Sequence, residues 1–201
     1  MKKMRYLIVL IILLQQVNIA AQNVMWLTSG KKLSIGEYKK TSPDLIIYKN
    51  MKGKSKSVQT FDVFLVTDKS GKEEIIYSPD TSYTDALTLV QMRSFVQGEY
   101  DAELKFKTPL TTIGGIAIAG ASSVVINPIY VLLISTAYCS SIGISKPFKA
   151  KLNIPSEFSQ DKYYILGYKK TVKHKRIKNA IIGSGIGLLA GLGTFAIISK
   201  K

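Results

Sequence analysis

Two long runs without a charged residue divide the polar sequence that follows the N-terminal segment. They cover residues 108–145 and 179–199, although 20% of the whole chain is charged. As a helix, the second run measures roughly 31 Å at ~1.5 Å per residue, which matches the hydrocarbon core of a bilayer. The first run is nearly twice as long and contains Asn127-Pro128, a signal for a turn or kink. These patterns predict an apolar membrane region at 108–145, broken at 127–128, and a transmembrane helix at 179–199.

Upstream of these runs, hydrophobic positions follow the period of strands. Residues 23–28, 33–39, 44–49, 57–67 and 74–78 are predicted as five short strands joined by turn sequences. In the fourth, alternation puts Phe61, Val63 and Leu65 on one face and Phe64 on the other. Residues 22–82 are therefore expected to form a small antiparallel, curled sheet or an SH3-like barrel. The predicted class is α+β, with this β domain followed by a helical, Gly- and Ala-rich transmembrane domain.

Residues 83–107 are predicted to form an amphipathic helix. Thr88 is a candidate N-cap with Gln91 at the capping-box spacing, and Met92, Phe95 and Val96 share a face. The acidic residues Glu99, Asp101 and Glu103 are interpreted as a solvated face, because no histidine or second carboxylate cluster completes a site. No catalytic, cofactor or metal site is expected, and the chain is predicted not to be an enzyme.

The N-terminus has the pattern of a signal peptide. Lys2, Lys3 and Arg5 precede an apolar core at 6–14, and Ala20-Ala21 makes cleavage before Gln22 plausible. An uncleaved anchor is the alternative for residues 1–21. In both cases the chain after Gln22 is expected to be exported.

The formal net charge of +15 is concentrated in one segment, the predicted basic loop or helix at 146–178. This segment holds 10 Lys/Arg against 2 Asp/Glu, whereas 22–107 holds 13 against 11. Short basic loops stay cytoplasmic, so the favoured arrangement has one crossing within 108–145, a return through 179–199, and the β domain in the periplasm at the inner membrane. The alternative is a helical hairpin that crosses twice and leaves the basic segment outside.

The basic side chains directly before the last run are expected to face anionic lipid head groups. Nucleic acid is the less favoured partner for this segment. The residues concerned are Lys169, Lys170, Lys173, Lys175, Arg176 and Lys178.

Small residues at a four-residue spacing predict close helix packing. Gly183, Gly187 and Gly191 share one helix face, and their expected partner is the Gly114, Gly115 and Ala119 face of the first run. Packing between helices of one chain and assembly into a homo-oligomer both fit this pattern. A weak internal repeat with an offset of 69 also relates the two regions, placing Phe95 and Gly98 over Tyr164 and Gly167.

Four motifs occur in order along the chain: Gly71-x-Glu73-Glu74-Ile75-x-Tyr77, Phe95-x-x-Gly98-Glu99-x-Asp101-Ala102, Tyr164-x-x-Gly167-Tyr168 and Lys175-Arg176-Ile177. Together they resemble a recurrent family of bacterial envelope proteins, of the type found in Bacteroidota. The resemblance implies the architecture above and an envelope location, and it carries no catalytic residue.

These features predict a non-enzymatic envelope membrane protein, a scaffold or accessory subunit whose β domain binds an unknown envelope partner. The alternative is a small oligomeric channel built on the glycine faces. For that channel, the candidate lining residues are Ser122, Ser123, Thr136 and Ser140.

Overall fold

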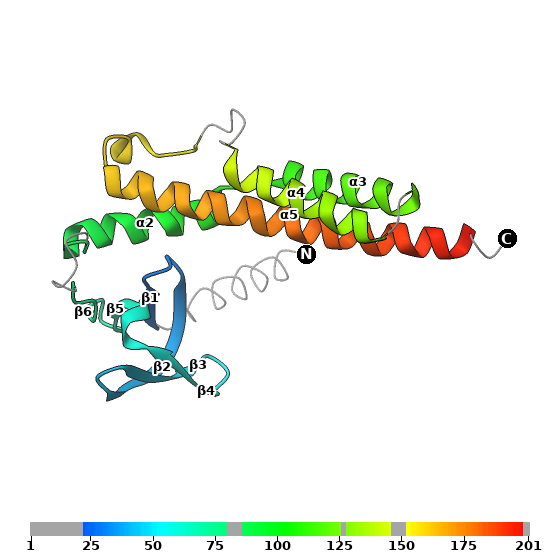
Figure 1. Cartoon of the computed structure of the whole chain (residues 1–201). Helices are drawn as coiled ribbons and strands as arrows, with labels where there is room; N and C mark the ends of the chain where they lie inside the picture. Colours follow the sequence, from blue (N-terminus) through cyan, green and yellow to red (C-terminus); the bar gives the residue numbers. More distant parts are fainter. Residues whose placement is uncertain (1–21, 80–85, 126–127, 146–151, 199–201) are drawn as a thin grey trace, which may run out of the picture. The chain divides into compact units, whose positions relative to one another are not determined.

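The structure is a computed structural model that describes residues 22–79, 86–125, 128–145 and 152–198 (Figure 1). The predicted signal peptide at 1–21 lies outside the described residues. The chain divides into two compact units, Met1–Leu89 and Val90–Lys201. We describe each unit by itself.

The first unit contains one six-stranded antiparallel sheet. Its strand order is β4-β3-β2-β1-β5-β6. The strands are β1 (Asn23–Leu27), β2 (Lys32–Ser42), β3 (Leu45–Asn50), β4 (Ser55–Gln59), β5 (Val63–Thr67) and β6 (Glu73–Ile75). The α+β class is confirmed, and the small antiparallel sheet lies where the strand periodicity predicts it.

The single strand predicted at 57–67 is wrong, because this segment contains two strands. A 3-10 turn, η2 (Thr60–Asp62), separates β4 from β5. β4 pairs with β3 and β5 pairs with β1, and β2 lies between those two partners, so one straight strand cannot make both sets of bonds. Phe61 falls in the turn and is 69% exposed instead of sharing a face with Val63 and Leu65.

The sheet curls around a small hydrophobic core. Met25, Ile35, Ile46, Val63 and Val66 form this core. The Tyr38 hydroxyl on β2 donates a 2.5 Å hydrogen bond to Glu74 on β6, although β1 and β5 lie between these strands in the sheet. A flat sheet would separate them by about three strand spacings of ~4.8 Å, so the bond requires curvature. Among the described residues no pairing joins β4 to β6, and the closed SH3-like barrel is not shown.

The second unit consists of helices with readable starts. They are α2 (Leu89–Lys105), α3 (Pro109–Val125), α4 (Pro128–Ile144) and α5 (Lys162–Ile198), with a 3-10 turn η3 (Ser156–Phe158) before α5. Pro109 and Pro128 each occupy a first helical position, where the missing N–H costs nothing. Asp161 caps α5 by accepting the backbone N–H groups of Tyr163 at 2.9 Å and Tyr164 at 3.0 Å.

The basic segment and the last apolar run belong to one helix. α5 is continuous over 37 residues, roughly 55 Å at ~1.5 Å per residue. The division at 178/179 therefore marks a change in the polarity of α5, not a break in the chain. Among the described residues α5 is the one helix long and apolar enough to cross a membrane, and 130–144 in α4 forms a shorter apolar helix.

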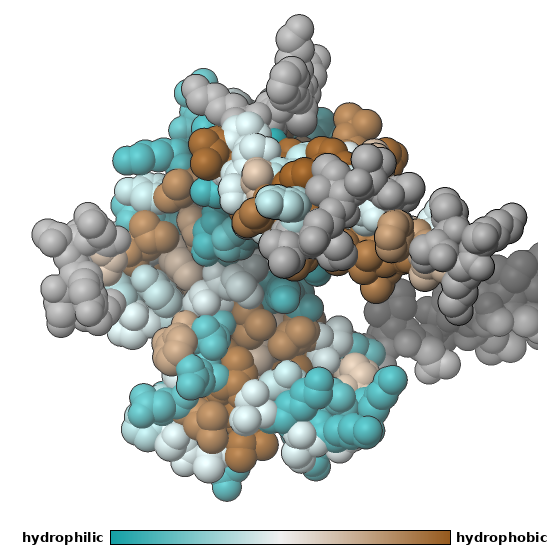
Figure 2. Space-filling view, turned by 45° about the vertical axis from the view of Figure 1, so that its right-hand side comes forward, coloured by the Kyte–Doolittle hydropathy of each residue, from teal (hydrophilic) through white to brown (hydrophobic). Residues whose placement is uncertain are grey.

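Large hydrophobic side chains are exposed on the apolar parts of α3, α4 and α5. Leu110 is 80% exposed, Leu133 62% and Leu189 74%. Hydrophobic side chains also reach the visible surface in Figure 2, where they appear brown. Exposed apolar side chains gathered on neighbouring helices are typical of surfaces that contact protein or membrane.

Candidate functional site

α3 and α5 approach each other closely along a line of small residues. A Cβ added at Gly183 would lie within 3.0 Å of the Thr112 backbone, and one at Gly187 within 3.0 Å of the Ile116 backbone. A Cβ at Gly115 would lie 2.7 Å from the Ala180 oxygen. Contacts this close exclude any side chain larger than hydrogen, so the glycines permit the two backbones to touch.

The structure brings four of the six predicted packing residues to this contact, namely Gly115, Gly183, Gly187 and Gly191. Gly191 continues it, because its added Cβ would meet Gly120 and Ser123, and Ala119 is fully buried. Gly114 lies elsewhere, since its added Cβ would meet the Tyr138 hydroxyl of α4.

The same kind of contact joins α2 to the first half of α5. An added Cβ at Gly98 would clash with the Tyr164 carbonyl, and one at Gly167 would clash with the Phe95 carbonyl. Each glycine thus faces the carbonyl of the residue three positions before the other. Residue numbers rise together along both contacts, so α2 and α3 run parallel to α5. These are the positions related by the offset of 69, a signal from which this contact could have been predicted.

The interpretation of Glu99 and Asp101 as a solvated face is wrong. Glu99 is 3% exposed and its Oε1 lies 2.9 Å from the Lys170 Nζ. Burial raises the pKa of the Glu99 carboxyl, although Lys170 acts in the opposite direction. Asp101 is 6% exposed and accepts a 2.7 Å hydrogen bond from the Tyr164 hydroxyl. Burial, reinforced by the bond to Asp101, raises the pKa of Tyr164.

Aromatic rings complete the buried surroundings of these carboxylates. Tyr164 and Tyr168 are fully buried with Phe106 and Val172. The Phe158 ring stacks on Tyr164 with centroids 4.3 Å apart, which closes the cluster from the segment before α5. The carboxylates therefore lie in an apolar environment between two helices, where each needs the partners it has.

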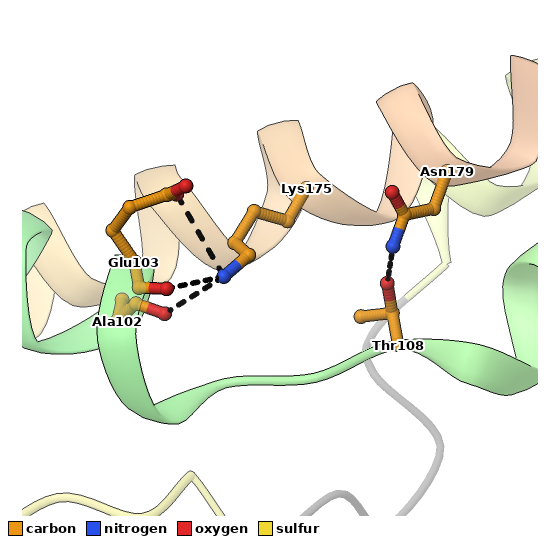
Figure 3. Close-up of polar contacts among 5 residues, drawn as sticks. All are labelled: Ala102, Glu103, Thr108, Lys175 and Asn179. Atoms are coloured by element: carbon orange, nitrogen blue, oxygen red, sulfur yellow. Dashed lines mark hydrogen bonds and ion pairs between the residues drawn. The ribbon is translucent and has the colours of Figure 1, made fainter. Parts of the chain in front are cut away.

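Side chains of α5 donate hydrogen bonds to the segment where α2 ends and α3 begins (Figure 3). The Lys175 Nζ donates to the carbonyl of Glu103 at 2.5 Å and to that of Ala102 at 3.4 Å. It also lies 3.7 Å from the Glu103 carboxylate. The Asn179 side-chain amide donates to the Thr108 hydroxyl. Lys175 thus places a positive charge at the C-terminal end of α2, where the helix carbonyls favour a cation; the Ala102 carbonyl also accepts the Phe106 N–H at 3.1 Å.

Of the six basic residues predicted to face lipid, three bind within the chain. Lys170 pairs with Glu99, and Lys175 binds the end of α2. Arg176 is 7% exposed and donates to the Ser145 carbonyl at 2.8 Å and to its hydroxyl at 3.0 Å. The prediction counted charges along one segment, and these partners on α2 and just after α4 are distant from it in sequence. The side chains of Lys169, Lys173 and Lys178 are exposed.

These contacts place α2 and the first half of α5 on the same side of the apolar helices. The favoured single-crossing arrangement requires a membrane between them, so it is incompatible with the Glu99–Lys170 and Asp101–Tyr164 contacts. The hairpin alternative is compatible with both.

The hydroxyl groups proposed to line a channel are engaged locally. Ser122, Ser123 and Thr136 each donate to a carbonyl of their own helix, three or four residues earlier. Within the described residues, no group of three or more His, Cys, Asp or Glu side chains could hold a metal ion.

Comparison with known proteins finds no matching family model, no matching curated protein and no matching solved structure. The distinctive feature of this chain is the parallel packing of α2 and α3 against α5. The packing is polar at one end and apolar at the other, and glycines permit the close contact of the backbones.

Proposed function

We propose that this chain is a non-enzymatic membrane protein of the cell envelope, a scaffold whose helical unit anchors a β unit that binds an envelope partner. One observation carries the proposal. In α3, α4 and the second half of α5, large apolar side chains point outward and small residues fill the interior. Ile182 on α5 is 45% exposed, whereas the adjacent Gly183 is buried against α3. Lipid is the solvent that favours this inverted distribution.

The lengths of the apolar segments support three crossings. α3 and α4 have 17 residues each, roughly 25 Å, and the uncharged part of α5 at 179–198 measures roughly 30 Å. These values are close to the ~30 Å hydrocarbon core, and the shorter helices suit a slightly thinned bilayer. α3 and α4 then form the hairpin, α5 makes the third crossing, and Lys162–Lys178 stays on the side of α2.

The β unit offers surface for a partner. Phe61 is 69% exposed in the turn before β5, and Ile75 on the edge strand β6 is 47% exposed. Exposed aromatic side chains and unpaired sheet edges are typical sites of protein contact. We place the partner-binding role here.

The channel alternative depends on glycine faces that are free to contact other chains. The glycine faces that it assigned to contacts between chains are filled by the contact of α3 with α5 in a single chain. We therefore do not propose a channel.

Cysteine labelling tests the proposal in the full chain. In a Cys139→Ser background, Lys52→Cys in the β unit, Lys173→Cys on α5 and a cysteine appended after Lys201 are each treated with a membrane-impermeant maleimide. We expect the first two to react without lysis and the appended cysteine to react only after lysis. Opposite behaviour of positions 52 and 173 would refute the three-crossing arrangement. Extraction of the protein by alkaline carbonate would refute membrane insertion.

A further inference from the structure

A cavity of about 550 Å³ lies where the polar and apolar halves of the helical unit meet. Phe106, Lys107 and Leu110 line it from the α2–α3 junction, Ile142 and Ser145 from the end of α4, and Arg176 from α5. Lys107 and Arg176 are among the last charged residues before the uncharged runs begin. The cavity is thus at the depth that phospholipid head groups occupy in the proposed arrangement.

Arg176 is the distinctive residue of this cavity. Its side chain is buried, and its guanidinium donates to the carbonyl and hydroxyl of Ser145. Lys170 and Lys175 each lie within 4 Å of a carboxylate, but no carboxylate of the described residues lies that close to Arg176. A guanidinium carries five N–H donors, and a buried cation is strongly favoured by a bound anion. The part of the chain that the structure describes provides both the cavity and an uncompensated positive charge within it.

The remaining lining selects the kind of anion. Phe106, Pro109, Leu110 and Ile142 are apolar, and Leu110 is 80% exposed along α3. A small hydrated anion gains no binding free energy from these apolar side chains. A hydrocarbon chain attached to the anion removes apolar surface from water, which contributes ~25 cal/mol per Å². The chemistry that fits both parts is a phosphate with acyl chains.

We propose that this cavity binds the anionic phosphate head of a membrane phospholipid at Arg176, with an acyl chain along Leu110 and Ile142. This inference rests on the membrane location proposed above. It differs from attraction of exposed lysines to an anionic surface, because the guanidinium is held in a built site and forms paired hydrogen bonds with the phosphate.

The test uses the purified full chain in neutral detergent, to which phosphatidylglycerol, zwitterionic phosphatidylcholine or inorganic phosphate is added at equal concentration. The unfolding midpoint reports binding. Arg176→Gln removes the guanidinium, and Lys173→Gln is the matched control, an equal loss of charge at an exposed position on the same helix. For the parent and for Lys173→Gln, we expect phosphatidylglycerol to raise the unfolding midpoint more than phosphatidylcholine or inorganic phosphate does. Arg176→Gln is expected to bind phosphatidylglycerol at least about tenfold more weakly, because its charge-assisted hydrogen bonds are lost.

Three results would overturn the site: equal responses of the parent to both lipids, retained preference in Arg176→Gln, or an equal loss in Lys173→Gln. An equal midpoint rise with inorganic phosphate would assign the site to a soluble anion. If Arg176→Gln does not fold, native mass spectrometry of the parent decides, because preferential retention of phosphatidylglycerol supports the site and equal retention refutes it. Loss of lipid preference with the labelling pattern intact refutes this site alone, whereas a failed labelling pattern refutes the membrane arrangement.

Discussion

Replacing Gly115 by alanine should weaken the contact between α3 and α5, and Gly185→Ala should not. The Cβ that Gly115→Ala introduces would begin 2.7 Å from the Ala180 oxygen and the Ser184 nitrogen, while ordinary contact begins at 3.4 Å. The two backbones must therefore separate by about 0.7 Å, and neither can yield as a flexible side chain would. At Gly185, which lies on α5, the partner helix in this contact, an added Cβ meets no atom within 4 Å.

The magnitude follows from this comparison. Overpacking of a close contact costs about 1–3 kcal/mol. A gap of 0.5–1 Å also forfeits about a quarter to a half of the dispersion energy of the neighbouring pairs. The gain in helix propensity from glycine to alanine, about 1 kcal/mol, is common to both variants and cancels between them. Gly115→Ala should thus be less stable than Gly185→Ala by about 1–3 kcal/mol, or roughly 4 °C or more in the unfolding midpoint.

The chain supplies its own reporter for this measurement. Cys139, the single cysteine, is half-buried on α4, with its Sγ 3.9 Å from the Ser184 hydroxyl of α5. A thiol-reactive fluorescent dye added during a thermal ramp in mild detergent reports the temperature at which the helices separate. If neither variant lowers the midpoint, the close approach of the backbones is contradicted. If both variants lower it equally, the loss of stability does not arise at the contact.

Three further predictions concern the polar half of the helical unit. Burial raises the pKa of Glu99, so the folded protein binds the Glu99 proton more tightly than the unfolded chain does. The free energy of unfolding should therefore fall as pH rises from 4.5, the ordinary pKa of this carboxyl, to its raised pKa in the folded protein. Glu99→Gln should flatten this part of a plot of midpoint against pH, and an unchanged slope would contradict the assignment. Tyr164→Phe removes the 2.7 Å bond to the buried Asp101 and should cost about 1–3 kcal/mol in denaturant titration, whereas Tyr163→Phe at the neighbouring half-buried position should be nearly neutral. Asp161→Ala should cost about 1 kcal/mol through loss of the α5 cap, and Asp161→Asn should recover most of it in the same titration; equal losses would argue against capping.

Local patterns were sufficient to predict the start of α2, the start of α4 after Asn127 and most strands, because their signals lie within a few residues. Asn127-Pro128 and the four-residue glycine spacing each act on the segment that contains them. The division of 57–67 into β4 and β5 was not predictable in this way. It depends on which strand each half pairs with, and that is a property of the whole sheet.

The environment of the acidic residues depends on partners distant in sequence. Asp101 is bonded to Tyr164, 63 residues away, so a search for ligands near the carboxylates could not find it. The same omission underlies the predicted single-crossing arrangement, which would separate these partners. The positive-inside rule counts basic residues as free charges, whereas Lys170 and Lys175 are paired with Glu99 and Glu103 on α2.

The unequal construction of the two parallel halves has a mechanical consequence. One side is interrupted between α2 and α3 at Phe106–Thr108, while α5 continues past this point without a break. Lys175 bonds α5 to the end of α2, and Asn179 bonds α5 to Thr108, the last residue of the interruption. The unbroken α5 therefore stiffens the bundle at this interruption. Bending there requires either bending α5 or breaking the hydrogen bonds of Lys175 and Asn179. A load applied at the polar end would be carried into the apolar end by α5 as by a stiff rod.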